Sequence, residues 1–94
     1  MSEGHVFLVG AGPGDPGLIT VKGLECLRRS EVLVYDRLAG PELLEYAPAA
    51  ARRVYVGKSP SHRAMPQAAI NELLAREAAA GRVVTRLKGG DPFV

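Results

Sequence analysis

Charged residues stand just after two apolar runs of the sequence. Asp36 directly follows residues 32–35, and Lys58 comes two residues after residues 54–56. Each run is typical of a buried strand, and the carboxyl ends of parallel strands open onto the ligand crevice of an α/β sheet. Asp36 could accept a proton or hold a cation there, and Lys58 could donate a proton or bind an anion. The alternatives stay open: Asp36 could begin a turn or pair with Arg37, and Lys58 could be a solvated loop lysine.

A glycine-rich segment, residues 10–17, follows the first apolar run and precedes a helical pattern. It contains the spacing G-x-G-x-x-G of dinucleotide-binding loops, and Asp36 would supply the acidic residue of that motif. Its two prolines each remove a backbone N–H donor, and Asp15 adds a negative charge, so the segment suits a diphosphate poorly. The composition favours close approach of a neutral or cationic group. A plain structural turn and a dinucleotide loop remain the alternatives.

A second glycine-rich turn ends the fourth apolar run, at Gly89, Gly90 and Asp91. Paired glycines permit close backbone approach or a positive φ. This turn is expected on the same edge of the sheet as Asp36 and Lys58. No metal site is expected, because His5 and His62 are far apart in sequence and have no cysteine or carboxylate neighbours at ligand spacing.

The elements that must position these residues follow from hydrophobic periodicity. Strands are predicted at residues 6–9, 32–35, 54–56 and 83–87, with helices between them. The first helix is expected to bury Ile19, Val21, Leu24 and Leu27 behind a Thr20 cap, and the second to span residues 41–46. The third is expected to open at Pro66, bury Ile70, Leu73, Leu74 and Ala78, and end at Gly81. The order βαβαβαβ predicts an open parallel sheet with helices on both faces and right-handed connections.

Length and composition bound the protein class. The sequence has 94 residues, 47% hydrophobic and 23% charged, with a net charge of +2 and one cysteine. These values exclude wholesale disorder, a disulfide scaffold and a membrane span, and the mild charge gives no reason to expect nucleic acid as a partner. The first residues lack the pattern of a signal peptide, so a cytoplasmic location is expected. Since the sequence stops just after a glycine-rich turn, we expect an incomplete α/β domain.

Five segments together resemble the tetrapyrrole methylase family. They occur in the family's order across nearly the whole sequence: VGAGPGDP at residues 9–16, VYDRL at 34–38, YVGK at 55–58, PQ with IN at 66–71, and RLKGGDPFV at 86–94. The resemblance implies that residues 1–94 are part of the N-terminal αβα domain of that fold, with the second domain absent. It also implies a homodimer, with the cofactor held in the cleft between two domains.

The resemblance implies an enzyme that transfers methyl groups from S-adenosylmethionine to carbons of uroporphyrinogen III, giving precorrin-2 on the route to sirohaem and cobalamin. Asp36 resembles the family's proton acceptor, and Lys58 resembles its proton donor. The positions that resemble cofactor contacts are Pro13, Gly89, Gly90, Asp91 and Val94. S-adenosylmethionine is the expected cofactor and no metal is expected, and residues 1–94 alone are expected to be inactive.

Arg37 and Arg63 are the expected substrate contacts, because a tetrapyrrole polycarboxylate suits the planar fork of arginine. The stretch at residues 59–63 departs from the arginine- and histidine-rich loop common in the family, which leaves substrate detail open. The alternatives are another tetrapyrrole or corrin methylase of the same fold and a dinucleotide-binding module.

Overall fold

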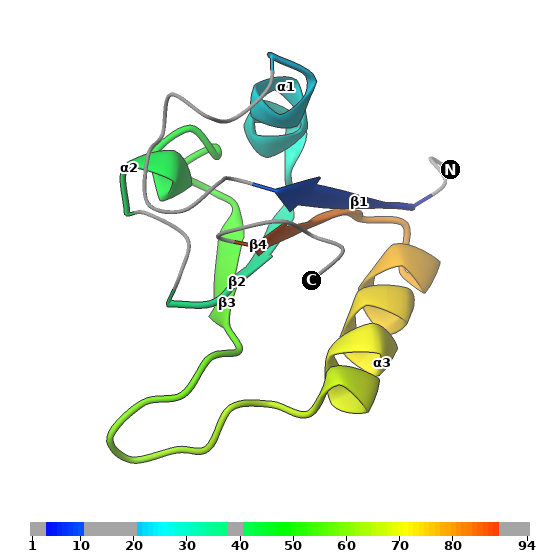
Figure 1. The fold of residues 1–94 in the computed structure, drawn as a ribbon. Helices are drawn as coiled ribbons and strands as arrows, with labels where there is room; N and C mark the ends of the chain where they lie inside the picture. Colours follow the sequence, from blue (N-terminus) through cyan, green and yellow to red (C-terminus); the bar gives the residue numbers. More distant parts are fainter. Residues whose placement is uncertain (1–3, 11–20, 38–40, 89–94) are drawn as a thin grey trace.

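The computed structural model describes residues 4–10, 21–37 and 41–88. Four strands and three helices alternate along this part of the chain (Figure 1): β1 (His5–Gly10), α1 (Val21–Arg29), β2 (Val32–Tyr35), α2 (Pro41–Leu44), β3 (Arg52–Tyr55), α3 (Gln67–Ala79) and β4 (Val83–Lys88). The strands form one sheet in the order β1-β4-β2-β3, and every neighbouring pair is parallel. The predicted α/β order and parallel sheet are confirmed.

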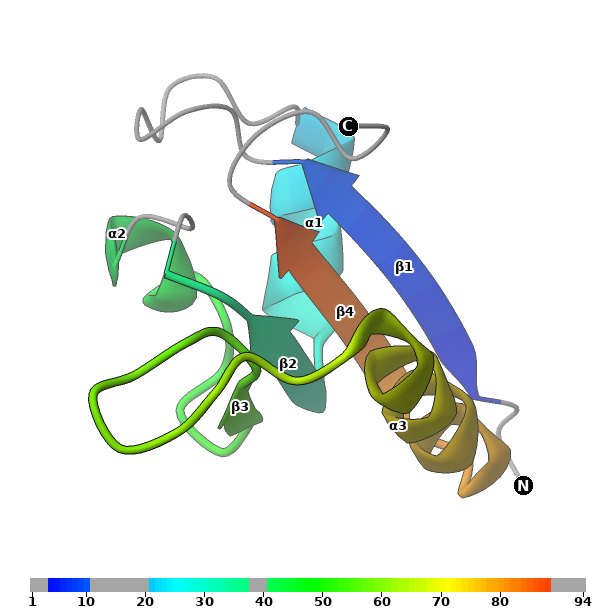
Figure 2. The ribbon, with the colours of Figure 1, turned by 60° about the horizontal axis from the view of Figure 1, so that its bottom comes forward.

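Helices cover both faces of the sheet, as Figure 2 shows with α3 in front and α1 behind. Leu33 and Leu87 belong to a cluster that includes Cys26 and Leu27 of α1 and Leu43 of α2. The alternate residues of the strands, such as Val34 and Val84, belong to a second cluster that α3 completes. Since successive side chains of a strand point to opposite faces, these apolar runs serve two cores at once.

The ends of α3 follow the local sequence signals. Pro66 is the N-cap residue, and Gly81 has a φ of 88° just after the helix. The Arg82 N–H donates to the Glu77 carbonyl at 3.3 Å, and the Gly81 N–H donates to the Ala78 carbonyl at 2.9 Å. This hydrogen-bond pair is the Schellman motif that a C′ glycine favours. Of the predicted apolar stripe, Ile70, Leu73 and Leu74 are buried and Ala78 is half-buried.

The buried face of α1 agrees with the prediction at Leu27 and differs from it at Val21. Val21 is 77% exposed, and the residues that meet the sheet are Gly23, Cys26 and Leu27. Gly23 and Cys26 are small residues, which a search for large apolar residues does not detect. Ile19 and Thr20 lie outside the described residues.

β3 begins two residues earlier than predicted, because Arg52 and Arg53 pair through their backbones with β2. α2 ends at Leu44, two residues earlier than predicted. The Arg53 guanidinium donates to the carbonyls of Leu44 at 2.8 Å and Ala51 at 3.0 Å, which supports the turns after α2. None of the helices in the described ranges is long and apolar enough to cross a membrane.

Candidate functional site

The carboxyl ends of β2 and β3 meet at one cavity. These strands are parallel neighbours, so the residues that follow them emerge at the same edge of the sheet. The cavity measures about 760 Å³ and is lined by Asp36, Arg37, Tyr55, Gly57, Lys58, Ser59 and Pro60. Asp36, Arg37 and Lys58 were predicted from the sequence as site residues. The structure brings these three into one cavity, with one carboxylate and two cations.

Lys58 is positioned by an aromatic side chain of β3. The Tyr55 hydroxyl donates a hydrogen bond to the Lys58 carbonyl at 2.8 Å. The Tyr55 ring meets the Tyr35 ring edge to face, with centroids 5.4 Å apart. A Cβ on Gly57 would lie 2.7 Å from the Tyr55 hydroxyl oxygen, so the lack of a side chain at residue 57 lets the chain turn against the phenol. The ring therefore sets where the backbone of Lys58 lies.

Asp36 is held from the sheet side by an arginine of β4. The Arg86 Nη2 donates to the Asp36 Oδ2 at 3.3 Å. The Arg86 side chain is 6% exposed and the Asp36 side chain 21% exposed, so the carboxylate lies between a buried cation and the cavity. The sequence offered Arg37 as an ion-pair partner of Asp36, whereas this ion pair is with Arg86 of β4. Arg86 was not among the predicted site residues, although a charge inside the apolar run 83–87 was a usable signal.

Arg63 lies at a second, smaller cavity. The loop after β3 closes at its tip through two backbone hydrogen bonds between Ser59 and His62, at 3.0 and 3.2 Å. Arg63 and His62 line a cavity of about 220 Å³, which shares Tyr55, Gly57 and Ser59 with the larger one. Arg63 therefore lines a cavity that adjoins the one lined by Asp36.

The predicted cofactor contacts lie outside the described residues: Pro13, Gly89, Gly90, Asp91 and Val94. The described strands nevertheless bring the starts of the two glycine-rich segments together. β1 and β4 are parallel neighbours, and Gly10 at the end of β1 pairs with Lys88 at the end of β4. Both segments thus depart from adjacent points on the edge of the sheet that also carries Asp36 and Lys58, which fits a ligand approached by both.

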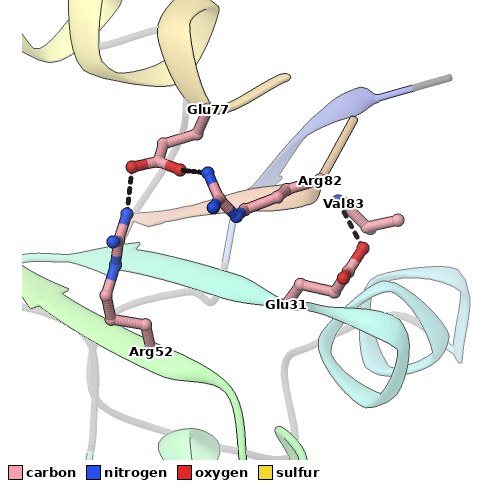
Figure 3. Close-up of polar contacts among 5 residues, drawn as sticks. All are labelled: Glu31, Arg52, Glu77, Arg82 and Val83. Atoms are coloured by element: carbon pink, nitrogen blue, oxygen red, sulfur yellow. Dashed lines mark hydrogen bonds and ion pairs between the residues drawn. The ribbon is translucent and has the colours of Figure 1, made fainter. Parts of the chain in front are cut away.

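The opposite, amino-terminal edge of the sheet carries a different charged cluster (Figure 3). Glu77 of α3 accepts hydrogen bonds from Arg52 of β3 and from Arg82, the latter at 2.7 Å. The Arg52 hydrogen bond is the largest influence, and with Arg82 it holds the pKa of the Glu77 carboxyl below its ordinary value, against the effect of burial. Glu31 accepts a hydrogen bond from the Val83 N–H at 3.0 Å. These contacts join helix to strands, so we assign the cluster to the fold.

Metal ligation finds no support in the described part of the chain, where His, Cys, Asp and Glu form no group of three able to hold an ion. Cys26 is buried in α1, as expected for a small core residue. Its carbonyl accepts a hydrogen bond from Ser30 at 2.8 Å, and Ser30 also contacts Thr85 at 2.6 Å. These polar groups are satisfied within the core.

The sequence matches the family described as Tetrapyrrole (Corrin/Porphyrin) Methylases over residues 5–94. The chain belongs to this family. It is 54% identical over 91 residues to a uroporphyrinogen-III C-methyltransferase of Priestia megaterium, covering 97% of this chain and 38% of the relative. It is 52% identical to siroheme synthase 2 of Cronobacter sakazakii, covering 98% of this chain and 20% of the relative. The chain therefore spans well under half the length of these relatives.

Solved structures give the same result for this tetrapyrrole methylase. A crystal structure of uroporphyrin-III-C-methyltransferase from Thermus thermophilus matches 100% of this chain and 38% of its own, with a TM-score of 0.81 and 44% identity. A structure of the Thermus thermophilus enzyme complexed with S-adenosyl homocysteine matches 96% of this chain and 34% of its own, with a TM-score of 0.74 and 47% identity. The predicted fold class and family are thus confirmed, and the dinucleotide-binding alternative is not favoured.

Proposed function

We propose that these residues are the N-terminal part of a longer S-adenosylmethionine-dependent C-methyltransferase that converts uroporphyrinogen III to precorrin-2, on the route to sirohaem and cobalamin. This longer protein is the full-length enzyme. The observation that carries the proposal is the cavity at the carboxyl ends of β2 and β3, lined by Asp36, Arg37 and Lys58. It occurs in a chain 54% identical to a uroporphyrinogen-III C-methyltransferase.

The charges at the cavity suit the chemistry of this reaction. Addition of a methyl group to a pyrrole carbon leaves a proton to be removed, and Asp36 is the carboxylate placed to accept it. Lys58 follows β3 and lines the same cavity as Asp36. Its ammonium group is available to donate a proton or to hold a carboxylate. Arg37 and Arg63 are exposed guanidinium groups that suit the acidic side chains of the substrate.

The methyl donor supplies a sulfonium-bound methyl group, which is the electrophile of the proposed reaction. We place its contacts at Pro13, Gly89, Gly90, Asp91 and Val94, on the family resemblance. The adjacent ends of β1 and β4 support this, because Gly10 pairs with Lys88 and the two glycine-rich segments therefore begin at neighbouring points of the sheet edge. A proline-rich loop and the Asp91 carboxylate suit a cationic ligand better than they suit a diphosphate.

The proposal extends to the setting of the enzyme. We propose a cytoplasmic homodimer, acting on a small-molecule tetrapyrrole, with no nucleic acid or membrane partner. The net charge of +2 gives no reason to expect nucleic acid, a single buried cysteine suits a reducing compartment, and the homodimer is proposed from the family resemblance. The chain of 94 residues is expected to lack turnover by itself, because it covers 38% of the Priestia megaterium relative and the cleft would be incomplete.

A direct assay tests the proposal. The full-length enzyme is incubated with uroporphyrinogen III and S-adenosylmethionine, and dimethylated product is followed by mass spectrometry. We expect an increase of two methyl groups. A panel of later corrin intermediates serves as control, and methylation of one of these in place of uroporphyrinogen III would contradict the proposed substrate. Sequencing of the gene beyond the Val94 codon tests the domain proposal, which requires an open frame that encodes a second α/β domain.

A further inference from the structure

Arg86 occupies a position where a parallel sheet normally has an apolar residue. β4 lies between β1 and β2, and Arg86 is paired in register with Leu8 on one side and Val34 on the other. The residue is 5% exposed. Strands in the middle of a sheet that is covered on both faces are usually apolar throughout. The position therefore has a charge that the fold does not require.

Stability does not explain the arginine well. Moving a charge out of water is costly, and a buried ion pair is often matched or exceeded in stability by apolar side chains of similar volume. A guanidinium also keeps its proton, so it cannot become neutral on burial. Glu77 is the other buried charge among the described residues. It differs from Arg86 in that both of its charged partners, the arginines of its ion pairs, are about half exposed, at 54% and 47%.

The contacts of Arg86 direct it towards the candidate site. Its Nη1 donates to the Leu87 carbonyl at 2.9 Å, and its Nη2 donates to the Asp36 Oδ2 at 3.3 Å. The two ends of one rigid, planar group are thus tied to the β4 backbone and to the Asp36 carboxylate. Asp36 lines the 760 Å³ cavity, so Arg86 reaches the cavity through Asp36.

We infer that Arg86 is a positioning residue, whose buried guanidinium fixes the Asp36 carboxylate at the wall of the cavity so that it can accept the proton released on methylation. This inference rests on the proposed function for its catalytic part. Its structural part, that Asp36 and Arg86 depend on each other, stands independently of the reaction. Asp36 touches the substrate, whereas Arg86 acts only through Asp36.

A double-mutant cycle in the full-length enzyme tests the inference. Arg86→Leu is expected to lower kcat by about 10- to 100-fold with little change in KM, by analogy with residues that orient a metal ligand from behind. Arg86→Lys, which keeps a charge but cannot form both contacts, should restore part of the loss. In an Asp36→Asn background, Arg86→Leu should lower kcat by a further factor of less than about two, because its effect passes through Asp36. Equal losses in both backgrounds would overturn the inference.

Arg53→Leu is the matched control, since Arg53 is also a strand arginine but its guanidinium donates to backbone carbonyls. It should lower the unfolding temperature without changing kcat. If the wild-type enzyme methylates no tetrapyrrole, the proposed function is wrong, and the same four variants of the Arg86–Asp36 cycle are read by thermal unfolding. Asp36→Asn should then lower the midpoint more when Arg86 is present than in the Arg86→Leu background. Additive midpoint shifts would show that Asp36 and Arg86 do not depend on each other. If Arg86→Leu does not fold, Arg86→Gln takes its place in the cycle.

Discussion

Gly57 is the position where one added methyl group tests the geometry of the cavity most directly. In a Gly57→Ala variant the new Cβ would lie 2.7 Å from the Tyr55 hydroxyl oxygen, 2.9 Å from Cζ of the ring and 3.2 Å from the Arg37 nitrogen. Ordinary van der Waals contact begins at 3.4 Å. The phenol must therefore move by about 0.7 Å, which is enough to strain or break its 2.8 Å hydrogen bond to the Lys58 carbonyl.

The expected cost of Gly57→Ala follows from these contacts. Overpacking a well-packed position costs about 1–3 kcal/mol, and the loss of a hydrogen bond costs about 0.5–1.5 kcal/mol. Tyr55 is 37% exposed, so the ring can shift towards solvent and the cost falls at the lower end. Gly57 does not have a positive φ, so backbone strain adds nothing. We expect a loss of about 1–2 kcal/mol in the free energy of unfolding.

Urea denaturation of the 94-residue chain measures this loss, with Tyr55→Leu as the background that removes the obstacle. Without the phenol, the Cβ of an alanine at residue 57 contacts the backbone nitrogen of Arg37 but no aromatic ring. Replacement of glycine by alanine at an unstrained position stabilises a protein by about 0.4–1 kcal/mol through the unfolded state. The cost of Gly57→Ala should therefore fall to near zero, or change sign, in the Tyr55→Leu background. An equal cost in both backgrounds would refute the role assigned to the ring.

Three further predictions concern the core, the amino-terminal edge and the site. Leu27→Ala should lower the free energy of unfolding by about 2–5 kcal/mol, since Leu27 is fully buried, and an unchanged urea midpoint would contradict its place in the core. Because the pKa of Glu77 is lowered on folding, its contribution to stability is present above the ordinary value of 4.5 and is lost as the pH falls through the lower, folded value. Urea midpoints measured between pH 6 and pH 2 should therefore fall less steeply in Glu77→Gln than in the wild type. In the full-length enzyme, Asp36→Ala should lower kcat by about 10²–10⁴-fold and leave the affinity for S-adenosylhomocysteine unchanged. A wild-type kcat in the Asp36→Ala variant would show that Asp36 is not the base. Lys58→Met should alter KM or kcat.

Local signals were sufficient where the backbone decides the structure. Pro66 and Gly81 mark the two ends of α3 because one fixes φ and the other accepts a φ of 88°. The strand β2 coincides with its apolar run. Hydrophobic size was a poor guide at α1, where Val21 is exposed and Gly23 is buried, because hydropathy alone does not show which side of a helix faces the sheet.

The site was predicted in part. Asp36 and Lys58 could be paired from the sequence because each follows an apolar run, and parallel strands deliver such residues to one edge. The charge inside the apolar run 83–87 marks Arg86, but its pairing with Asp36 depends on which strands are neighbours. Tyr55 was not predicted, because its contact with the Lys58 carbonyl depends on the turn at Gly57. The order β1-β4-β2-β3 places Arg86 beside β2, and no pattern within one strand contains that information.

The two buried charges on the side of the sheet covered by α3 divide the molecule into edges with different roles. Glu77 lies at the amino-terminal edge between two arginines and links α3 to the strands. Arg86 lies near the carboxyl-terminal edge and is joined to a carboxylate that faces a cavity. A charge that serves the fold alone should affect unfolding and leave the chemical step alone, whereas a charge that serves the site should affect the chemical step beyond its effect on unfolding. The ratio of the kcat effect to the unfolding effect should therefore be small for Glu77→Gln and large for Arg86→Leu, and a ratio for Arg86→Leu as small as that for Glu77→Gln would show that Arg86 serves the fold alone.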